Sequence, residues 1–249
     1  MRVIGGRFRS RLLVAPKGAA TRPTSDRLRE TLFNILAARA GGLEGVRFVD
    51  LYAGTGAVGI EAVSRGAAQV WLAEKAEPAL KAIRANLKAL GIGESRAEGD
   101  PRSAEKMVVE ARGTMALLER LAKAAMSQGL KAANLAEPLL PGLKSRPISE
   151  AEARKDVRPG NAKPFSSGVV DVVFLDPPWE ADFEYAQTLE FLGSERGRAM
   201  LAEDSVVIAE HSAKKKLAER YGALMRTREM KQGDAGLTFY RLEKVEPLV

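Results

Sequence analysis

The sequence predicts an α/β fold with a doubly wound, mostly parallel sheet of seven strands and a C-terminal antiparallel hairpin. Strand-like and helix-like patterns alternate from Val46 to Asp100, as a parallel sheet requires. A glycine string, Gly54 to Gly59, joins the first of these strands to a helix. A later apolar run, Val169 to Leu175, ends in Asp-Pro-Pro-Trp. Ligands of doubly wound sheets bind beyond the carboxyl ends of the strands, and both motifs fall at such ends.

The first 90 residues supply the expected elements in chain order. Short strands at Val3-Ile4 and Leu12–Val14 suggest an N-terminal hairpin. A helix follows Thr24 or Ser25, either of which can cap it, and Gly41-Gly42 ends it. The next expected elements are a strand over 46–51, a helix starting at 59, a strand over 69–74 and an amphipathic helix over 77–90.

The alternation lapses after these elements. A short third strand leads to Asp100, and Asp171 lies 71 residues further on, about twice the length that one helix and two loops need. We expect about 105–166 to hold the crossover helix and an insertion rich in Pro, Gly, Ser and charge. The chain then divides into a basic arm, 1–23, and one large domain, 24–249. The remaining expected elements are strands over 169–175 and 204–212, a helix over 214–222 and a hairpin over 223–244.

Composition removes several classes of function. The 249 residues include no cysteine and a single histidine, His211. Disulfides, thiolate metal sites and a cysteine nucleophile are excluded, and a zinc hydrolase or a Ser-His-Asp triad is not expected. No run approaches the roughly 18 apolar residues of a membrane span, and the N-terminus lacks the pattern of a secretory signal. We expect a cytoplasmic protein without metal or membrane association, a monomer by default, in which His211 is structural.

Positive charge is concentrated at the N-terminus. Residues 1–29 carry eight basic side chains and one acid, a net charge of +7 that equals the net charge of the whole chain. A basic arm on a neutral body suits nucleic acid, and arginine favours bidentate contacts with phosphate. The alternative is a solvated, poorly ordered tail. The candidate nucleic-acid contacts are Arg7, Arg9, Arg11, Arg22, Arg27 and Arg29.

The glycine string indicates a nucleoside cofactor. Gly54, Gly56 and Gly59 fit the pattern G-x-G-x-x-G, which brings the backbone close to a ligand at a helix N-terminus. Glu74 follows 20 residues after Gly54, at the end of the next strand. A carboxylate at this position can accept bonds from both ribose hydroxyls.

The type of nucleoside stays open at this point, because NAD(P) and S-adenosylmethionine both use such a loop. Asp50 would repel a pyrophosphate and suits a cationic amino-acid group, directly or through water. Asp100 either faces the adenine or caps a helix. The candidate cofactor residues are Asp50, Ala53, Gly54, Thr55, Gly56, Glu74, Lys75 and Asp100.

The Asp-Pro-Pro-Trp turn predicts a site that acts on an amine. The Asp176 carboxylate and the Pro177 carbonyl can accept hydrogen bonds from an exocyclic NH₂, which turns the nitrogen lone pair toward a methyl sulfonium. Pro178 stiffens the turn, so that the acceptors are placed in advance. Trp179 offers a face for a flipped base, worth on the order of 1–3 kcal/mol. The alternative is a strand end followed by a Pro-Pro turn and a surface tryptophan.

Five segments resemble one known family. In chain order they read RVIGGRFRSRLL, RPTSDRLRETLFNIL, VDLYAGTGAVGIEAVSRGA, FLDPPW and GLTFYRL. The chain resembles the bacterial small-subunit ribosomal RNA guanine-N2 methyltransferases of family D, with a Rossmann-like methyltransferase fold. The likeness spans nearly all of the chain except about 105–166, and RPTSDRLRETLFN is its most specific part.

The resemblance implies S-adenosylmethionine as donor, the exocyclic N2 of one guanine in 16S rRNA as acceptor, and a partly assembled 30S subunit as partner. It implies that residues 176–179 hold the guanine and that the basic arm contacts rRNA. It also implies that the cofactor is held by Asp50, Gly54, Gly56, Glu74 and Asp100. The chain departs from the family pattern in Trp179, where Tyr or Phe is commoner, and in its insertion, which puts the assignment of Asp100 in doubt.

Direct in-line transfer of the methyl group is therefore our leading hypothesis. The rivals are an amino-group methyltransferase acting on DNA adenine or protein glutamine, and a non-catalytic RNA-binding assembly factor. An NAD(P) oxidoreductase is a third rival, which leaves the turn and the arm unexplained.

Overall fold

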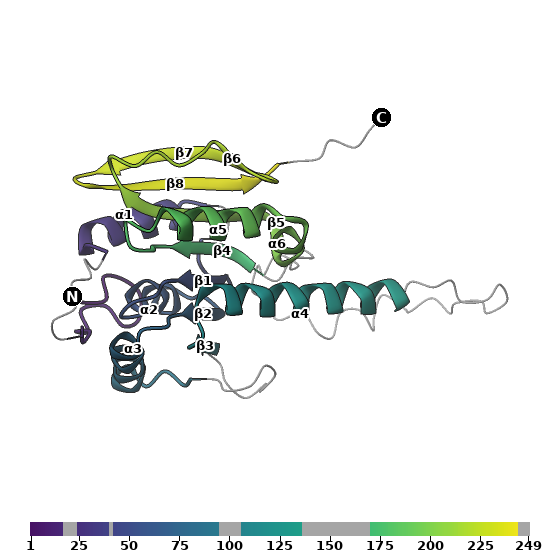
Figure 1. Ribbon diagram of the computed structural model, residues 1–249. Helices are drawn as coiled ribbons and strands as arrows, with labels where there is room; N and C mark the ends of the chain where they lie inside the picture. The colour runs from purple at the N-terminus through teal and green to yellow at the C-terminus, as the bar shows by residue number, and fades with distance from the viewer. Residues whose placement is uncertain (17–23, 40–41, 95–105, 136–169, 244–249) are drawn as a thin grey trace.

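The computed structural model describes residues 1–16, 24–39, 42–94, 106–135 and 170–243. Its centre is a mixed sheet of eight strands in the order β3-β2-β1-β4-β5-β8-β7-β6 (Figure 1). The parallel strands are β1 (Arg47–Leu51), β2 (Gln69–Ala73), β3 (Lys106–Glu110), β4 (Val170–Leu175) and β5 (Leu201–Ser212). The strand order reverses between β1 and β4, so the loops that follow these two neighbours diverge and leave a crevice for a ligand.

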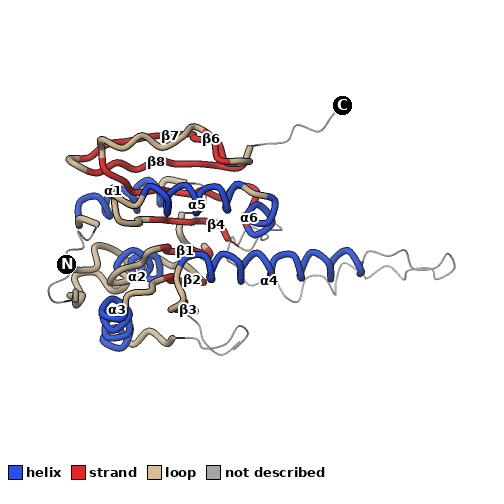
Figure 2. Tube along the Cα trace, viewed as in Figure 1, coloured by secondary structure: helices blue, strands red, loops and turns tan. Residues whose placement is uncertain are grey.

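The antiparallel strands complete one side of the sheet. They are β6 (Arg220–Tyr221), β7 (Leu224–Gln232) and β8 (Ala235–Leu242), with β8 paired to β5. Figure 2 shows them at one end of the row of strands, with β3 at the other. The expected hairpin is confirmed, and the two residues of β6 account for the eighth strand.

Six helices cover the two faces of the sheet within the described residues. They are α1 (Asp26–Ala37), α2 (Ala57–Ser64), α3 (Glu77–Leu90), α4 (Thr114–Leu135), α5 (Asp182–Gly193) and α6 (Glu195–Met200). Buried apolar residues of α1, α2 and α3 pack in one core with Phe48, Val172 and Phe174. The second core joins α4, α5 and α6 to Val49 and Val173 on the opposite face. Adjacent strand residues thus enter different cores, as a sheet covered on both faces requires.

Sequence patterns located most elements but misplaced two. The third strand is Lys106–Glu110, inside the interval assigned to the crossover and insertion, and not the segment that leads to Asp100. Asp100 itself lies outside the described residues, as does most of the expected insertion. No helix forms over 214–222, where the chain turns and then enters β6. Among the described residues, no helix is both long enough and apolar enough to cross a bilayer.

The N-terminal arm is a docked hairpin. Its expected strands reduce to a single antiparallel bridge between Arg2 and Leu12. The backbone N–H groups of Ile4 and Gly5 each donate to the carboxylate of Glu61, a fully buried residue of α2, at 2.7 Å. Residues 1–16 are therefore attached to the domain, which corrects the alternative of a poorly ordered tail.

Candidate active site

A tight turn joins β1 to α2 and carries the glycine pattern. Gly54 and Gly56 have φ values of 56° and 75°, in the left-handed region that glycine adopts without strain. Tyr52 also has a positive φ of 62°, which is strained for a bulky residue and is typical of functional loops. Its hydroxyl lies 2.8 Å from the Thr188 hydroxyl, which helps to hold this conformation. The predicted loop is present, at the N-terminus of a helix.

Asp50, near the end of β1, holds the glycine loop and the first turn of α2 in place. Its carboxylate accepts a hydrogen bond from the Gly59 N–H at 2.9 Å, and the side chain is only 1% exposed. Burial, opposed by this bond and reinforced by Glu74 and Glu210, raises the pKa of Asp50 to about 7. A Cβ on Gly59 would lie 2.3 Å from a Leu72 methyl, so glycine permits this close approach. Asp50 thus positions α2, in addition to the contact with the cofactor, directly or through water, that we predicted for it.

Glu74 ties the glycine loop to the start of α3. One carboxylate oxygen accepts from the Gly54 N–H at 2.9 Å, and the other accepts from the N–H groups of Lys75 and Ala76 at 2.7 Å each. A carboxylate offers about four acceptor positions, so three are already in use. Bonds to both ribose hydroxyls would therefore displace a backbone donor. The exposed Lys75 ammonium forms an ion pair with Glu184 of α5 at 3.3 Å.

The Asp-Pro-Pro-Trp turn lies beside this loop. The Asp176 N–H donates to the Leu51 carbonyl at 3.3 Å, which fixes the start of the turn against the end of β1. Asp176 and Trp179 are half-buried, Pro177 is buried and Pro178 is exposed. Trp179 packs against the core that contains α1, α2 and α3. The two predicted motifs therefore meet at the reversal point of the strand order.

A second carboxylate shares the environment of Asp176. The Thr24 hydroxyl lies 3.3 Å from Asp176 Oδ2 and 2.9 Å from Glu210 Oε2. Glu210 is buried near the end of β5. Burial raises the pKa of Asp176 well above its usual range, and the charges of Glu210 and Asp50 add to this, while the bond from Thr24 opposes it. Asp176 therefore holds a proton more readily than an isolated aspartate does.

Acidic residues mark the carboxyl ends of all five parallel strands. Glu110 ends β3, the position that we expected Asp100 to occupy, and pairs with Arg112 at 2.8 Å. The other four interact with one another through their charges. They are Asp50, Glu74, Asp176 and Glu210. The edge where the two motifs meet is therefore lined by acidic side chains, of which Asp50 and Asp176 have raised pKa values.

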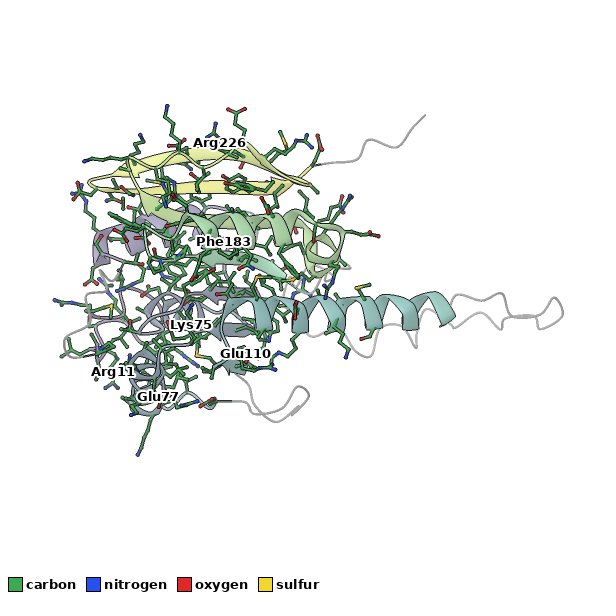
Figure 3. The ribbon with its side chains drawn as sticks, in the orientation of Figure 1. Arg11, Lys75, Glu77, Glu110, Phe183 and Arg226 are labelled. Atoms are coloured by element: carbon green, nitrogen blue, oxygen red, sulfur yellow. The ribbon has the colours of Figure 1, made fainter. Side chains whose placement is uncertain are left out.

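The arm presents several of the predicted arginines to solvent. Arg7, Arg9 and Arg11 are exposed, as is Arg27 on the first turn of α1. The arm begins on the side of the molecule toward which the parallel strands run, where Figure 3 labels Arg11. Arg22 lies outside the described residues.

Arg29 was wrongly assigned to the nucleic-acid surface. Its side chain has no exposed surface. It donates to the Arg2 carbonyl, forms an ion pair with Asp26 at 3.0 Å, and lies 3.9 Å from Glu61. Arg29 thus connects α1 to the arm. The helical register that exposes Arg27 turns Arg29 inward, because residues two apart lie on nearly opposite sides of a helix.

His211 is structural, as expected. The buried ring bonds the Ser212 carbonyl through Nδ1 at 2.9 Å and the Thr238 hydroxyl through Nε2 at 2.8 Å. Burial lowers the pKa of His211, so the ring is neutral. A histidine with both nitrogens engaged inside the sheet is not placed to exchange protons with a substrate.

Four residues near the turn were missed in the sequence. Thr24 was considered only as a helix cap, but Ser25 takes that role by accepting from the Leu28 N–H at 3.1 Å. Glu210 had a readable signal, since it is an acid near the end of the strand that follows Asp176 in the sheet. Tyr185 and Lys215 had none, because only the packing of α5 and of the loop after β5 brings them to the turn.

The Rossmann-like sheet and the site at its edge define a methyltransferase. Solved structures with the same architecture include a candidate methyltransferase of Escherichia coli, which is 25% identical, with 98% of each chain covered and a TM-score of 0.60. A candidate methylase of Haemophilus influenzae shows the same fold at 23% identity, with 97% of this chain and 98% of that chain covered and a TM-score of 0.60.

The chain belongs to the family described as Conserved hypothetical protein 95, whose model matches residues 1–117 and 132–241. The candidate rRNA methyltransferase YlbH of Bacillus subtilis is 27% identical over 241 residues, 97% of this chain and 98% of that protein. The ribosomal RNA small subunit methyltransferase D of Escherichia coli is 42% identical over 96 residues, 39% of this chain and 47% of that protein. The family resemblance is confirmed.

Proposed function

We propose that this protein transfers a methyl group from S-adenosylmethionine to the exocyclic N2 of a guanine in 16S rRNA. Asp176 beside the Pro177 carbonyl, at the acidic edge next to the glycine loop, is the observation that carries the proposal. The substrate would be an assembling 30S subunit in the cytoplasm, bound by the protein as a monomer. Residues 1–23 would serve as the RNA-binding arm.

The residues at the sheet edge suit S-adenosylmethionine. Its sulfonium and ammonium groups are cationic and suit an edge lined by acidic side chains, whereas the pyrophosphate of NAD(P) would be disfavoured there. The left-handed Gly54 and Gly56 leave the backbone bare at the N-terminus of α2. Glu74 and Lys75 flank the loop. We assign the cofactor to this loop and to Glu74, with Asp50 as an indirect support.

The chain's own residues would prepare the amine for reaction. When bound, S-adenosylmethionine supplies an electrophilic methyl group. Asp176 and the Pro177 carbonyl accept the two N–H groups of the guanine amine and so direct the nitrogen lone pair away from the ring. Trp179 stacks on the base. Asp176 would also take the surplus proton that the amine nitrogen carries once it has received the methyl group.

Parallel methylation assays test the proposal. Purified 30S particles, naked 16S rRNA, duplex DNA and a release factor are each incubated with the protein and labelled S-adenosylmethionine. We expect label in 30S particles or rRNA, located at guanine N2 by mass spectrometry and missing from 16S rRNA of cells that lack the protein. Label only in DNA or protein would select a rival amino-group methyltransferase. No transfer and no heat of cofactor binding in calorimetry would indicate an RNA-binding assembly factor.

Charge on the arm is expected to control RNA affinity. Arg7→Ala and Arg9→Ala should weaken binding and lower the slope of log K against log salt by about 1 for each lost phosphate contact. The measurement is a titration of rRNA at several salt concentrations. Arg198→Ala is the matched control, because this exposed arginine lies on α6, at the end of the sheet where β5 begins and away from the arm (Figure 1). Slopes that stay equal in all three variants would remove the arm from the RNA interface.

Docking of the arm can be tested without changing its charge. Gly6 has a φ of 72°, and a Cβ there would lie 1.8 Å from the Ser64 carbonyl oxygen. The same carbonyl accepts from the Arg7 N–H at 2.8 Å. Gly6→Ala should therefore detach the turn and weaken rRNA binding about as much as loss of one arginine, with the salt slope largely kept. Affinity equal to that of the unaltered protein would show that the docked conformation is not used.

A further inference from the structure

Three consecutive lysines follow β5, and one of them differs from its neighbours. Lys214 and Lys216 are exposed, whereas the Lys215 side chain is only 15% exposed. All three line an open pocket of about 610 Å³ next to Trp179. In the sequence, the three lysines are most simply the solvated start of the helix expected over 214–222, with RNA contact as the alternative. The structure separates Lys215 from the other two by its contacts.

The Lys215 ammonium is directed at the Asp-Pro-Pro-Trp turn. It donates to the Trp179 carbonyl oxygen and to the Asp182 carboxylate, the latter at 2.5 Å. It also stands 4.2 Å from the centre of the Tyr185 ring, within the range of a cation–π contact. Lys215 therefore joins the loop after β5 to the end of the turn and to the first residues of α5.

Tyr185 holds the other end of the same turn. Tyr185 is 1% exposed, and its single hydroxyl proton is shared between the Pro177 carbonyl at 3.2 Å and the Glu210 carbonyl at 2.9 Å. The carbonyl groups on either side of Pro178 are thus both fixed, one by Tyr185 and one by Lys215. A carbonyl oxygen has two lone pairs, so Pro177 keeps one for a substrate amine.

We propose that Lys215 and Tyr185 are positioning residues that brace the base-binding turn before the substrate base enters. This inference rests on the proposed function. Tyr185 sets the direction of the Pro177 carbonyl, and Lys215 fixes the backbone that carries Trp179. An acceptor held in place needs no rearrangement during the reaction, and a misplacement of about 1 Å can cost on the order of 100-fold in rate.

The lysine run supplies its own matched controls. Lys215→Met keeps the length of the side chain but removes the charge, and Lys214→Met and Lys216→Met remove the same charge from the same pocket. We expect Lys215→Met to lower the single-turnover methylation rate at saturating 30S particles by about tenfold or more. Its Kd for rRNA should change no more than in the two controls. Lys215→Arg, which retains a charged donor, should recover most of the rate.

A second set of variants keeps the test decisive if Lys215→Met unfolds. The Asp182 side chain is 86% exposed, so Asp182→Asn leaves the core intact and should lower the rate a few-fold through Lys215. Tyr185→Phe keeps the ring and removes only the hydroxyl, and it should slow the same step. Because the two braces hold one turn, Lys215→Met combined with Tyr185→Phe should cost less than the product of the single effects.

Two outcomes would overturn the inference. If the three lysine variants weaken rRNA binding equally and none alters the single-turnover rate, the run is a plain electrostatic contact. If Asp182→Asn and Tyr185→Phe both react at the unaltered rate, the turn needs no brace. Either result presumes that the unaltered protein methylates 30S particles or rRNA. Its failure to methylate any substrate would instead contradict the proposed function.

Discussion

Asp176→Ala is expected to lower the single-turnover methylation rate by a factor of about 100 or more, with cofactor affinity kept within a few-fold. The loss of one preorganised polar group at a reacting centre typically costs on the order of 10²–10³ in rate. Asp176 accepts an N–H of the substrate amine in our proposal and does not support the glycine loop, which is held by Asp50 and Glu74. Rates are measured by rapid quench on 30S particles, and cofactor affinity by calorimetry.

Asp176→Asn separates loss of charge from loss of an acceptor. Asparagine keeps one carbonyl oxygen toward the amine, so a smaller loss of rate is expected than with alanine. The raised pKa of Asp176 means that its charge destabilises the fold at neutral pH, so the asparagine variant should unfold at the same temperature or a higher one. A large fall in cofactor affinity in either variant would show that Asp176 binds the cofactor and not the base.

The parallel part of the sheet was predictable because each strand is a short apolar run bounded by strong local signals. Gly54 and Gly56 mark one boundary, since the left-handed turn excludes most other residues there. Pro177 and Pro178 mark another, because proline cannot continue a strand interior. Both motifs carry their chemistry in contiguous residues, and for that reason the sequence brought them to the correct edge of the sheet.

Features that depend on packing could not be read in the same way. The helix expected over 214–222 has acceptable local propensity, but Leu217 is buried in the second core and Arg220 pairs with β7, which requires an extended chain. Arg29 looks identical to Arg27 in a basic segment, and only the docking of the arm on Glu61 reveals that it is buried. The third strand was misplaced because Lys106–Glu110, although marked by the β-branched pair Val108-Val109, was assigned together with the helix-like residues that follow it.

The pH dependence of methylation should move in opposite directions when the two partners of Asp176 are changed. An ionised Asp176 is a stronger acceptor for the amine than the protonated form and can take up its surplus proton, so the rate falls as the pH drops through the pKa of this group. The Glu210 charge raises that pKa, and the Thr24 hydroxyl lowers it. Glu210→Gln should therefore shift the acidic limb of the profile to lower pH, and Thr24→Val should shift it to higher pH.

The experiment is a series of single-turnover rates against pH, with the midpoint of the acidic limb as the readout in place of the plateau. Glu203→Gln is the matched control, because this exposed glutamate lies near the start of β5, at the opposite end of the strand from Glu210. Its midpoint should equal that of the unaltered protein. Packing damage alone lowers the plateau and has no reason to move two midpoints in opposite directions, so shifts of the same sign, or none, would show that Asp176 is not the group that titrates.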